Sequence, residues 1–367
     1  MQISNTILEI TSARPDVERP DLTRPDWVNG LERPTDALWL DKNENLDPIL
    51  AEWNRKLVSE LDPRSIGTYP ECAPLYRKLG ESLDLHPRHL LLTPGSDGAI
   101  RAVFEAFISP GDRVIHTVPT FAMYSVYSKM YGAQVTPLEY EPSEQGPSLS
   151  VDRFLEKIKS TKPKLVCLAN PDSPTGTVFN SAELRKIIEA AGQAKALILV
   201  DEAYHPFYEP SVVQWVSQYP HLVVARTFAK AWGLAGLRIG YAVASASVAP
   251  LLHKVRSMYE VNTLAVDILS RALDHPDQML ASVKRLNDGK AFFLKEMEQK
   301  KLRVLQGHGN FLHVAFGKSA ERVFKALDGH VLFRKDFSEP CLKGFSRFSS
   351  TTQEIFKPVV SKVLESL

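Results

Sequence analysis

The sequence has little of two features that mark common classes of protein, an excess of one charge and cysteine. It carries 44 Lys and Arg side chains against 43 Asp and Glu in 367 residues. This balance excludes the basic excess that draws a protein to nucleic acid or to an anionic membrane surface. The three cysteines, Cys72, Cys167 and Cys341, are odd in number and widely spaced. They predict reduced thiols without a disulfide framework or zinc spacing, so we expect no metal.

Long apolar runs are also missing. No run approaches the roughly 18 residues that mark a membrane-spanning helix. The N-terminus lacks the basic and then apolar pattern of a signal peptide. We therefore expect a cytoplasmic, soluble protein whose partners are small molecules. The length suggests two domains, and a composition of 44% hydrophobic and 24% charged residues is typical of a globular chain with a large core.

One lysine motif is the most informative feature that is present. Lys230 lies among small residues after an apolar run, with Thr227 before it and Arg238 after it. A lysine becomes a useful nucleophile where its surroundings favour the neutral amine, for example beside another cation. The planar guanidinium of Arg238 and the hydroxyl of Thr227 suit the oxygens of a phosphate. The segment indicates a site for pyridoxal phosphate, with a surface lysine and a structural arginine as the alternative.

Two further motifs place polar residues at the ends of predicted buried strands. The apolar run 196–200 ends in Asp201, with Tyr204 three positions on, and a second apolar run ends in Asn170. Polar groups at the carboxyl ends of parallel strands usually face a ligand crevice. Asp201 can pair with a protonated ring nitrogen of the cofactor, whereas Tyr204 and Asn170 can bond its phenolic oxygen. The alternative for Asp201 alone is a cap on the following turn.

With these three segments the chain resembles the class I and II aminotransferases of fold type I, which use pyridoxal phosphate, and most closely their histidinol-phosphate aminotransferase branch. The motifs occur in the family's order, and the resemblance runs from about Leu40 to the C-terminus. It implies an α/β protein with a large, doubly wound, mostly parallel sheet domain and a smaller α+β domain. It also implies a homodimer in which Tyr69 reaches the cofactor phosphate of the neighbouring subunit.

The resemblance implies further cofactor residues and the substrate residues. Ser96 and Asp97, in a glycine turn that opens a helix, match the family's phosphate-binding pair, and a helix N-terminus suits an anion. Phe121 falls where relatives stack an aromatic ring on the cofactor. Toward the C-terminus, the family's substrate-binding positions are matched by three residues: Arg347 as the anion anchor, Arg334 as a second arginine and Asn310 at the border of the site.

Some positions depart from the family pattern. Ala229 replaces the serine that commonly precedes the lysine, which leaves Thr227 and Arg238 to hold more of the phosphate. Gly98 stands where the branch usually has glutamate, and Asp172-Ser173 replaces an asparagine-rich turn. The proline-rich segment 14–26 lacks the expected Pro-Tyr element. The identity of the substrate is therefore the most open part of the interpretation.

The order of predicted elements agrees with this fold. Short apolar strands at 113–118, 165–169, 197–200 and 222–226 alternate with helical patterns, which favours parallel pairing. A capping box at Asn180 and Glu183 predicts a helix start. From about residue 263 the pattern changes to a long helical stretch, strands near 302–305 and 311–314, and a final helix. We expect an N-terminal arm (1–45) packed on the smaller domain, a large cofactor-binding domain (46–262) and a small domain (263–367).

The predicted activity is transfer of an amino group from histidinol phosphate, or a related aromatic or phosphorylated amine or amino acid, to a 2-oxo acid such as 2-oxoglutarate. Lys230, Asp201 and Tyr204 are the predicted catalytic residues, with Lys230 as the base. Two alternatives stay open. One is decarboxylation of a phosphorylated amino acid on the same fold. The other is a cofactor-binding regulator without turnover, which generally carries an added DNA-binding domain that the short N-terminal segment cannot hold.

Overall fold

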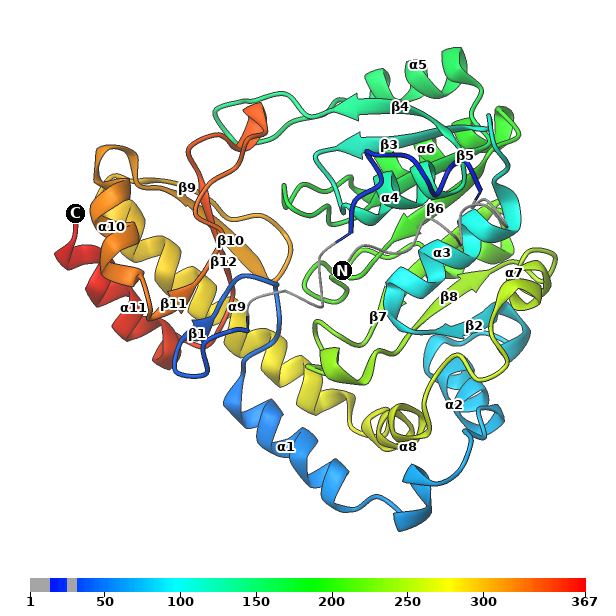
Figure 1. The fold of residues 1–367 in the computed structure, drawn as a ribbon, viewed down its shortest axis with the longest axis horizontal. Coiled ribbons are helices and arrows are strands. Elements are labelled where there is room, and N and C mark those ends of the chain that lie inside the picture. Colours follow the sequence, from blue (N-terminus) through cyan, green and yellow to red (C-terminus); the bar gives the residue numbers. More distant parts are fainter. Residues whose placement is uncertain (1–13, 25–31) are drawn as a thin grey trace, which may run out of the picture.

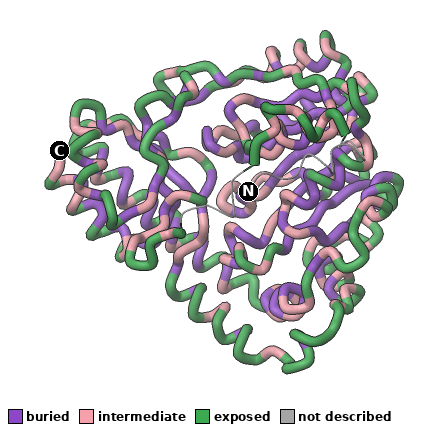
Figure 2. The backbone as a smooth tube through the Cα atoms, in the orientation of Figure 1, coloured by how far each residue is buried: buried purple, intermediate pink, exposed green. Residues whose placement is uncertain are grey.

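Two units make up the part of the chain that the computed structural model describes, residues 14–24 and 32–367. A seven-stranded sheet flanked by helices forms the larger unit, and a three-stranded sheet with its own helices forms the smaller one (Figure 1). Figure 2 shows buried residues along the strands of the large sheet and exposed residues along its outer helices. None of the described helices is long and apolar enough to cross a membrane.

The large sheet has the strand order β2-β8-β7-β6-β5-β3-β4. Its strands are β2 (Leu90–Thr93), β3 (Arg113–Val118), β4 (Gln134–Glu139), β5 (Leu165–Ala169), β6 (Leu197–Asp201), β7 (Leu222–Thr227) and β8 (Gly240–Ala244). β8 runs antiparallel to both neighbours, and all the other pairs are parallel. The four strands predicted from apolar runs are present as β3, β5, β6 and β7, and the mostly parallel sheet is confirmed.

Successive side chains of the central strands enter two separate cores. Cys167 and Leu199 pack on one face of the sheet, whereas Leu168 and Val200 pack on the other. This alternation is expected because neighbouring residues of a strand point to opposite faces. The first face is covered by α3 (Gly95–Phe107), α4 (Met123–Met130) and α7 (Ala249–Val255), and the second by α2 (Ala73–Leu83), α5 (Val151–Thr161), α6 (Ser181–Gln193) and α8 (Thr263–Ala272). The sheet is doubly wound, as predicted.

The helix predicted after Asn180 is α6, and it begins with the predicted capping box. The Asn180 side chain accepts a hydrogen bond from the Glu183 backbone N–H, and the Glu183 carboxylate accepts one from the Asn180 N–H. These bonds satisfy N–H groups that a helix start leaves without partners. The buried stripe of the helix consists of Leu184, Ile187, Ile188 and Ala191.

The smaller unit has the sheet order β12-β10-β9. Its elements are β9 (Arg303–Leu305), β10 (Phe311–Ala315), β12 (Ser346–Ser349), α9 (Pro276–Gln299), α10 (Ala320–Leu327) and α11 (Gln353–Glu365). Phenylalanine rings pack together in its core: the ring centroid of Phe293 lies 5.4 Å from that of Phe348 and 4.9 Å from that of Phe356. The predicted long helix, the two strands and the final helix are all present.

Helix α9 belongs to both units. Met279 and Val283 near its start pack in the core of the large unit, whereas Phe293 and Met297 pack in the core of the smaller one. Helix α8 also packs in the large core, against α1 (Pro48–Ser59) and α2. The sequence placed the domain boundary at residue 263, but in the structure the chain leaves the large core only within α9.

The N-terminal arm divides its contacts between the two units. Residues 14–24 lie on the large unit, where Lys129 of α4 donates to the Asp21 backbone carbonyl at 2.9 Å and pairs with the Asp21 carboxylate at 3.1 Å. β1 (Leu38–Trp39) instead pairs with β11 (Val331–Leu332) of the smaller unit, and Leu40 is buried in that core. The rest of the predicted arm, residues 1–13 and 25–31, lies outside the described residues.

Candidate active site

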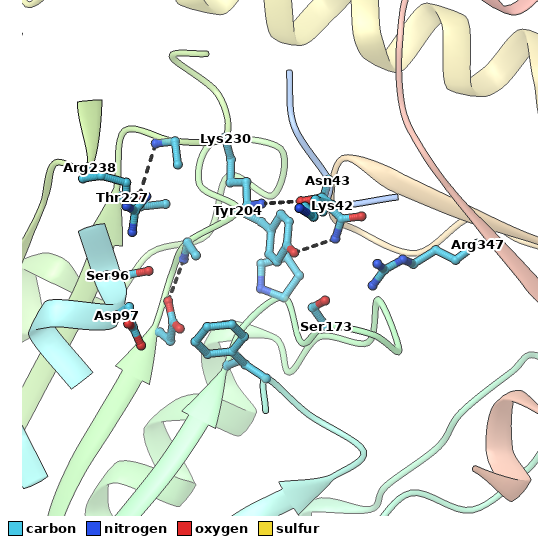
Figure 3. A pocket seen from close by; sticks show the side chains of 16 residues that line it. Lys42, Asn43, Ser96, Asp97, Ser173, Tyr204, Thr227, Lys230, Arg238 and Arg347 are labelled. Atoms are coloured by element: carbon cyan, nitrogen blue, oxygen red, sulfur yellow. Dashed lines mark hydrogen bonds between the residues drawn. The ribbon is translucent and has the colours of Figure 1, made fainter. Parts of the chain in front are cut away.

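A cavity of about 310 Å³ lies where the carboxyl ends of the large sheet's strands meet the N-terminal arm and the smaller unit. Its walls are formed by Lys42, Asn43, Ser96, Asp97, Phe121, Ala169, Pro171, Ser173, Asp201, Ala203, Tyr204, Thr227, Ala229, Lys230, Arg238 and Arg347. In Figure 3, Ser96, Thr227 and Arg238 lie on one side, Arg347 lies on the opposite side, and Lys230 and Tyr204 lie between them. A cation therefore stands at each end of the cavity with the lysine in the middle.

Lys230 follows β7 and extends its amine into the cavity. Its Nζ donates to the Lys42 carbonyl at 2.9 Å and lies 5.9 Å from the centroid of the Tyr204 ring. Burial, and next the charge of Arg347, lower the pKa of Lys230 to about 8. A lysine in water is almost wholly protonated at pH 8, so this site raises the neutral fraction of the amine, which is the reactive form.

Asp201 is the last residue of β6 and is buried beneath the cavity. One carboxylate oxygen accepts from the Ala203 N–H at 3.0 Å, and the other accepts from the Tyr124 hydroxyl at 3.2 Å. Burial raises the pKa of Asp201 to about 7. The ionised form of such a group gains from a cationic partner, and a protonated ring nitrogen is one.

A third group of polar side chains joins the arm to the strand ends. Asn43 Nδ2 donates to the Tyr204 hydroxyl at 2.8 Å, and this bond connects the arm to the loop after β6. Ser173, in the turn after β5, lines the cavity beside Tyr204 (Figure 3). The hydroxyls of Tyr204 and Ser173 can both form hydrogen bonds with an oxygen atom of a ligand bound in the cavity.

The start of α3 and the segment after β7 form an anion cradle. Gly95 has a φ of +77°, and a Cβ there would lie 2.7 Å from Arg238 Nη2. A Cβ on Gly240 would lie 2.8 Å from the Ser96 backbone nitrogen. Glycine at both positions lets the guanidinium and the first N–H groups of the helix approach the same space. Together with the Thr227 hydroxyl, they suit a phosphate.

Two more predicted cofactor residues line this end of the cavity. The Asp97 carboxylate accepts from the Tyr127 hydroxyl at 3.1 Å, and burial raises the pKa of Asp97. Phe121, after β3, is 37% exposed and meets Tyr124 edge to face, with 6.1 Å between the ring centroids. A ring exposed to this extent inside a cavity offers a face for stacking.

Arg347, from β12, supplies the cation at the opposite end. Its Nη2 donates to the Asp41 carbonyl at 2.8 Å, and the guanidinium lies 5.5 Å from the centroid of the Phe311 ring. The buried Nε–H has no hydrogen-bond partner among the described residues. A buried donor without a partner costs free energy, so an anion bound here would stabilise this guanidinium.

Four predicted site residues do not line the cavity. Asn310 is buried and donates to the Asn43 carbonyl at 2.9 Å, so it supports the arm from behind. The Arg334 guanidinium stacks on Phe337 at 4.2 Å and bonds the Asp336 carbonyl. The other two are Asn170 and Tyr69, and each has a separate environment.

Asn170 was expected to face the cofactor, but its side chain holds the backbone of the same turn. Its Oδ1 accepts from the Phe179 N–H at 2.7 Å, and its Nδ2 donates to the Phe179 carbonyl at 3.2 Å. Ser173, three residues further on, takes the place in the cavity wall. In the sequence, Asp172-Ser173 departs from the family pattern, but no local signal predicts that either residue belongs to the site.

Tyr69 lies on the surface, away from this chain's own cavity. It is 71% exposed and stacks on Tyr259, with 4.0 Å between ring centroids and 12° between ring planes. Lys42 and Asn43, by contrast, line the cavity although the predicted site did not include them. The sequence signal for them is the segment Asn43-Glu44-Asn45, which resembles an N-terminal Asn-Glu-Asn element of the family.

The residues present fit pyridoxal phosphate. The glycine cradle matches a phosphate, the buried carboxyl of Asp201 matches a ring nitrogen, and Lys230 lies between them and Arg347. Within the part of the chain that the structure describes, no group of three or more His, Cys, Asp or Glu side chains can hold a metal ion.

Residues 35–363 match the family model described as aminotransferase class I and II. The histidinol-phosphate aminotransferase of Thermoanaerobacter sp. (strain X514) is 33% identical over 305 residues, which cover 82% of this chain and 84% of the relative. The enzyme of the same name from Escherichia coli O81 (strain ED1a) is 29% identical over 333 residues, 88% and 89% of the two chains.

Solved structures share the fold. Histidinol-phosphate aminotransferase from Sinorhizobium meliloti, crystallised in complex with pyridoxal-5′-phosphate, superposes with a TM-score of 0.75 at 20% identity, and 90% of each chain is covered. A mutant of Thermus thermophilus aspartate aminotransferase superposes with a TM-score of 0.74 at 21% identity, covering 92% of this chain and all of that one. The fold predicted from the resemblance is confirmed.

Proposed function

Because the chain belongs to the class I and II aminotransferases, we propose that it transfers the amino group of histidinol phosphate, or of a related aromatic or phosphorylated amine, to a 2-oxo acid such as 2-oxoglutarate. Its cofactor is pyridoxal 5′-phosphate, as in this class of enzyme. The names of the relatives support the choice of donor. A cytoplasmic location and small-molecule partners are part of the same proposal.

The main support for this function is that the cavity has an arginine at each end, Arg238 and Arg347. Arg238 and the start of α3 suit the cofactor phosphate, which leaves Arg347 for the substrate. The planar guanidinium of Arg347, whose Nε–H has no partner within residues 14–24 and 32–367, suits a carboxylate or a phosphate, since both present two oxygens to the fork. One arginine can thus serve the phosphorylated donor in the first half-reaction and the 2-oxo acid in the second.

Lys230 is the group that moves the proton. When bound, the cofactor supplies the electron withdrawal that makes the proton on the substrate's amine-bearing carbon removable. The lowered pKa of Lys230, about 8, provides neutral amine near the pH of the cell. The Lys42 carbonyl holds Nζ at 2.9 Å, so the arm keeps the base in place between substrate and cofactor.

The other polar groups hold the reacting atoms without moving protons themselves. The buried carboxylate of Asp201 would pair with the ring nitrogen of the bound cofactor and would keep that nitrogen protonated. Tyr204, bonded by Asn43, and Ser173 point their hydroxyls into the cavity and can bond the cofactor's phenolic oxygen. In this proposal Ser173 joins Asn170 in this role, since the bond to the Phe179 carbonyl uses only one of the two N–H groups of Asn170 Nδ2.

The proposal includes a homodimer in which Tyr69 completes the site of the neighbouring subunit. Its exposure supports this, because Ile66, Tyr69, Met258 and Tyr259 are all exposed apolar residues of two neighbouring segments. The test mixes two inactive variants, Lys230→Ala and Tyr69→Ala, under subunit exchange. A hybrid dimer then has one site with both residues intact, so activity should return. Mixtures that stay inactive would contradict the shared site.

The donor is tested by measuring glutamate formed from 2-oxoglutarate by the protein loaded with pyridoxal phosphate. Histidinol phosphate, phenylalanine and tyrosine are compared as donors, and histidinol without its phosphate is the matched control. The proposal expects kcat/KM for histidinol phosphate to exceed that for histidinol by at least about a hundredfold, because Arg347 binds the phosphate. Carbon dioxide released from a phosphorylated amino acid, without glutamate, would contradict transamination and favour the decarboxylase.

A further inference from the structure

One buried carboxylate of the large unit has no part in the site described above. Asp172, in the turn after β5, is 0% exposed. Three hydroxyls donate to it: Thr117 at 2.7 Å and Tyr140 at 2.9 Å to Oδ2, and Thr120 at 2.6 Å to Oδ1. A buried carboxylate is stable only when donors surround it, so this cluster is a built feature of the fold.

The three donors come from different parts of the large sheet. Thr117 belongs to β3 and Tyr140 directly follows β4, whereas Thr120 lies in the loop between β3 and α4. Of the three hydroxyls, Thr120 is the one that bonds Oδ1, and the next residue in the chain is Phe121. The carboxylate therefore ties the turn that carries Ser173 to the loop that carries Phe121, and both of these residues line the cavity.

Phe121 depends on its backbone for its position. The residue is 37% exposed, and the ring pair it makes among the described residues is the edge-to-face contact with Tyr124. A hydrogen bond from the preceding residue to a buried charge fixes the backbone at this point. Asp172 is thus connected to Phe121 by a short path through Thr120.

We propose that Asp172 is a positioning residue for the reaction, which holds the Phe121 ring in the cavity wall through the Thr120 hydroxyl. The inference rests on the proposed function, since the position of the ring matters only if a flat cofactor stacks on it. A purely structural role for Asp172 leads to a different expectation. In that case the loss of any one of its three hydroxyl bonds would affect cofactor binding equally.

Thr120 and Tyr140 provide the discriminating variants. Asp172→Asn is the direct change, but it alters all three hydroxyl bonds at once and can reduce folding. Thr120→Val removes one hydroxyl with little change of shape on the side of Phe121, and Thr120→Ser restores the hydroxyl. Tyr140→Phe removes one hydroxyl from the same carboxylate at a residue that does not line the cavity, and serves as the matched control.

For each variant, the dissociation constant for pyridoxal phosphate is measured by titration of the cofactor-free full chain. The thermal unfolding midpoint and the visible circular dichroism of the bound cofactor are recorded as well. Thr120→Val should weaken cofactor binding about tenfold and change the dichroism. Thr120→Ser should restore both, and Tyr140→Phe should stay within about twofold of the unmodified chain.

Equal losses of affinity in Thr120→Val and Tyr140→Phe, following their losses in thermal stability, would show that Asp172 is structural and would overturn the inference. Unchanged affinity in Thr120→Val would overturn it as well. If the unmodified chain bound no pyridoxal phosphate, the proposed function would fail first and the inference with it. The titration of the unmodified chain therefore distinguishes the two failures.

Discussion

Lys290 of α9 allows a quantitative test of the structure through its buried amine. The residue is only 5% exposed, and its Nζ donates to the carbonyls of Gly307 at 2.8 Å and Gly309 at 3.0 Å. The loop that these bonds shape meets the turn after β5, where the His308 N–H donates to the Gly176 carbonyl at 2.9 Å. Lys290 thus supports the contact between the smaller unit and the strand ends.

Burial lowers the pKa of Lys290 to about 7. The unfolded chain has a lysine pKa of about 10.4, so between these values the unfolded state binds more protons than the folded state. The free energy of unfolding therefore rises with pH, by up to about 1.4 kcal/mol for each pH unit. The cost of burying the charge is fully present below the folded pKa and disappears as the pH approaches the unfolded one.

The perturbation is Lys290→Met, which keeps the length of the side chain and removes the amine. Urea unfolding of both proteins, followed by far-ultraviolet circular dichroism, gives the difference in their free energies of unfolding. This difference, unmodified minus variant, should grow by about 2 kcal/mol between about pH 7.5 and about pH 9.5. Lys295→Met, at an exposed position of the same helix, is the control and should show no such growth. A Lys290 difference that stays constant with pH would refute the reasoning.

Three further predictions concern the site. Lys230→Ala should abolish turnover but still bind pyridoxal phosphate non-covalently, which equilibrium dialysis and a turnover assay check together; normal turnover would refute the assignment. Asp201→Ala should keep the covalent bond of Lys230 to the cofactor but slow proton removal by about a hundredfold or more in stopped-flow absorbance, because the ring nitrogen loses its buried negative partner; an unaltered rate would contradict its role. Arg347→Met should reduce kcat/KM for histidinol phosphate about a hundredfold, whereas Arg334→Met should cost only a fewfold because that guanidinium stacks on Phe337 and does not line the cavity. Equal losses in these last two variants would contradict the position of the substrate anion.

The strand ends could be predicted from the sequence because their signals are local. The apolar run that forms β6 stops at Asp201, and a charge there cannot continue a buried strand. Thr227 at the end of β7, and Lys230 just after it, carry the same kind of signal. Parallel strands then bring these ends together at one edge of the sheet, so the residues meet although they are far apart in the chain.

The turn after β5 could not be predicted in the same way. Asn170 and Ser173 are both polar and close together, and the choice between them depends on which one bonds backbone elsewhere. Phe179 supplies both partners of Asn170 from nine residues further on, which no local pattern reveals. Asp172 depends even more on distant partners, because its three hydroxyl donors come from β3, its following loop and the end of β4.

The different environments of Arg334 and Arg347 in the smaller unit could not be predicted from the sequence either. Both are arginines near the C-terminal strands, and their backbones pair with each other in an antiparallel bridge. Their guanidinium groups nevertheless differ, since Arg334 stacks on Phe337 near the surface and Arg347 reaches the cavity. Side-chain direction follows from strand pairing and neighbours, which the sequence does not state.

We propose that this chain uses Lys230 and pyridoxal phosphate to take an amino group from histidinol phosphate. The most direct test is the absorption spectrum of the purified protein with its cofactor, recorded before and after addition of histidinol phosphate without any 2-oxo acid. We expect the absorption band of the lysine-bound cofactor to be replaced by that of pyridoxamine phosphate, and 2-oxoglutarate to restore the first band. A spectrum that histidinol phosphate leaves unchanged would contradict the proposed donor, and the absence of a lysine-bound band from the start would contradict the assignment of Lys230.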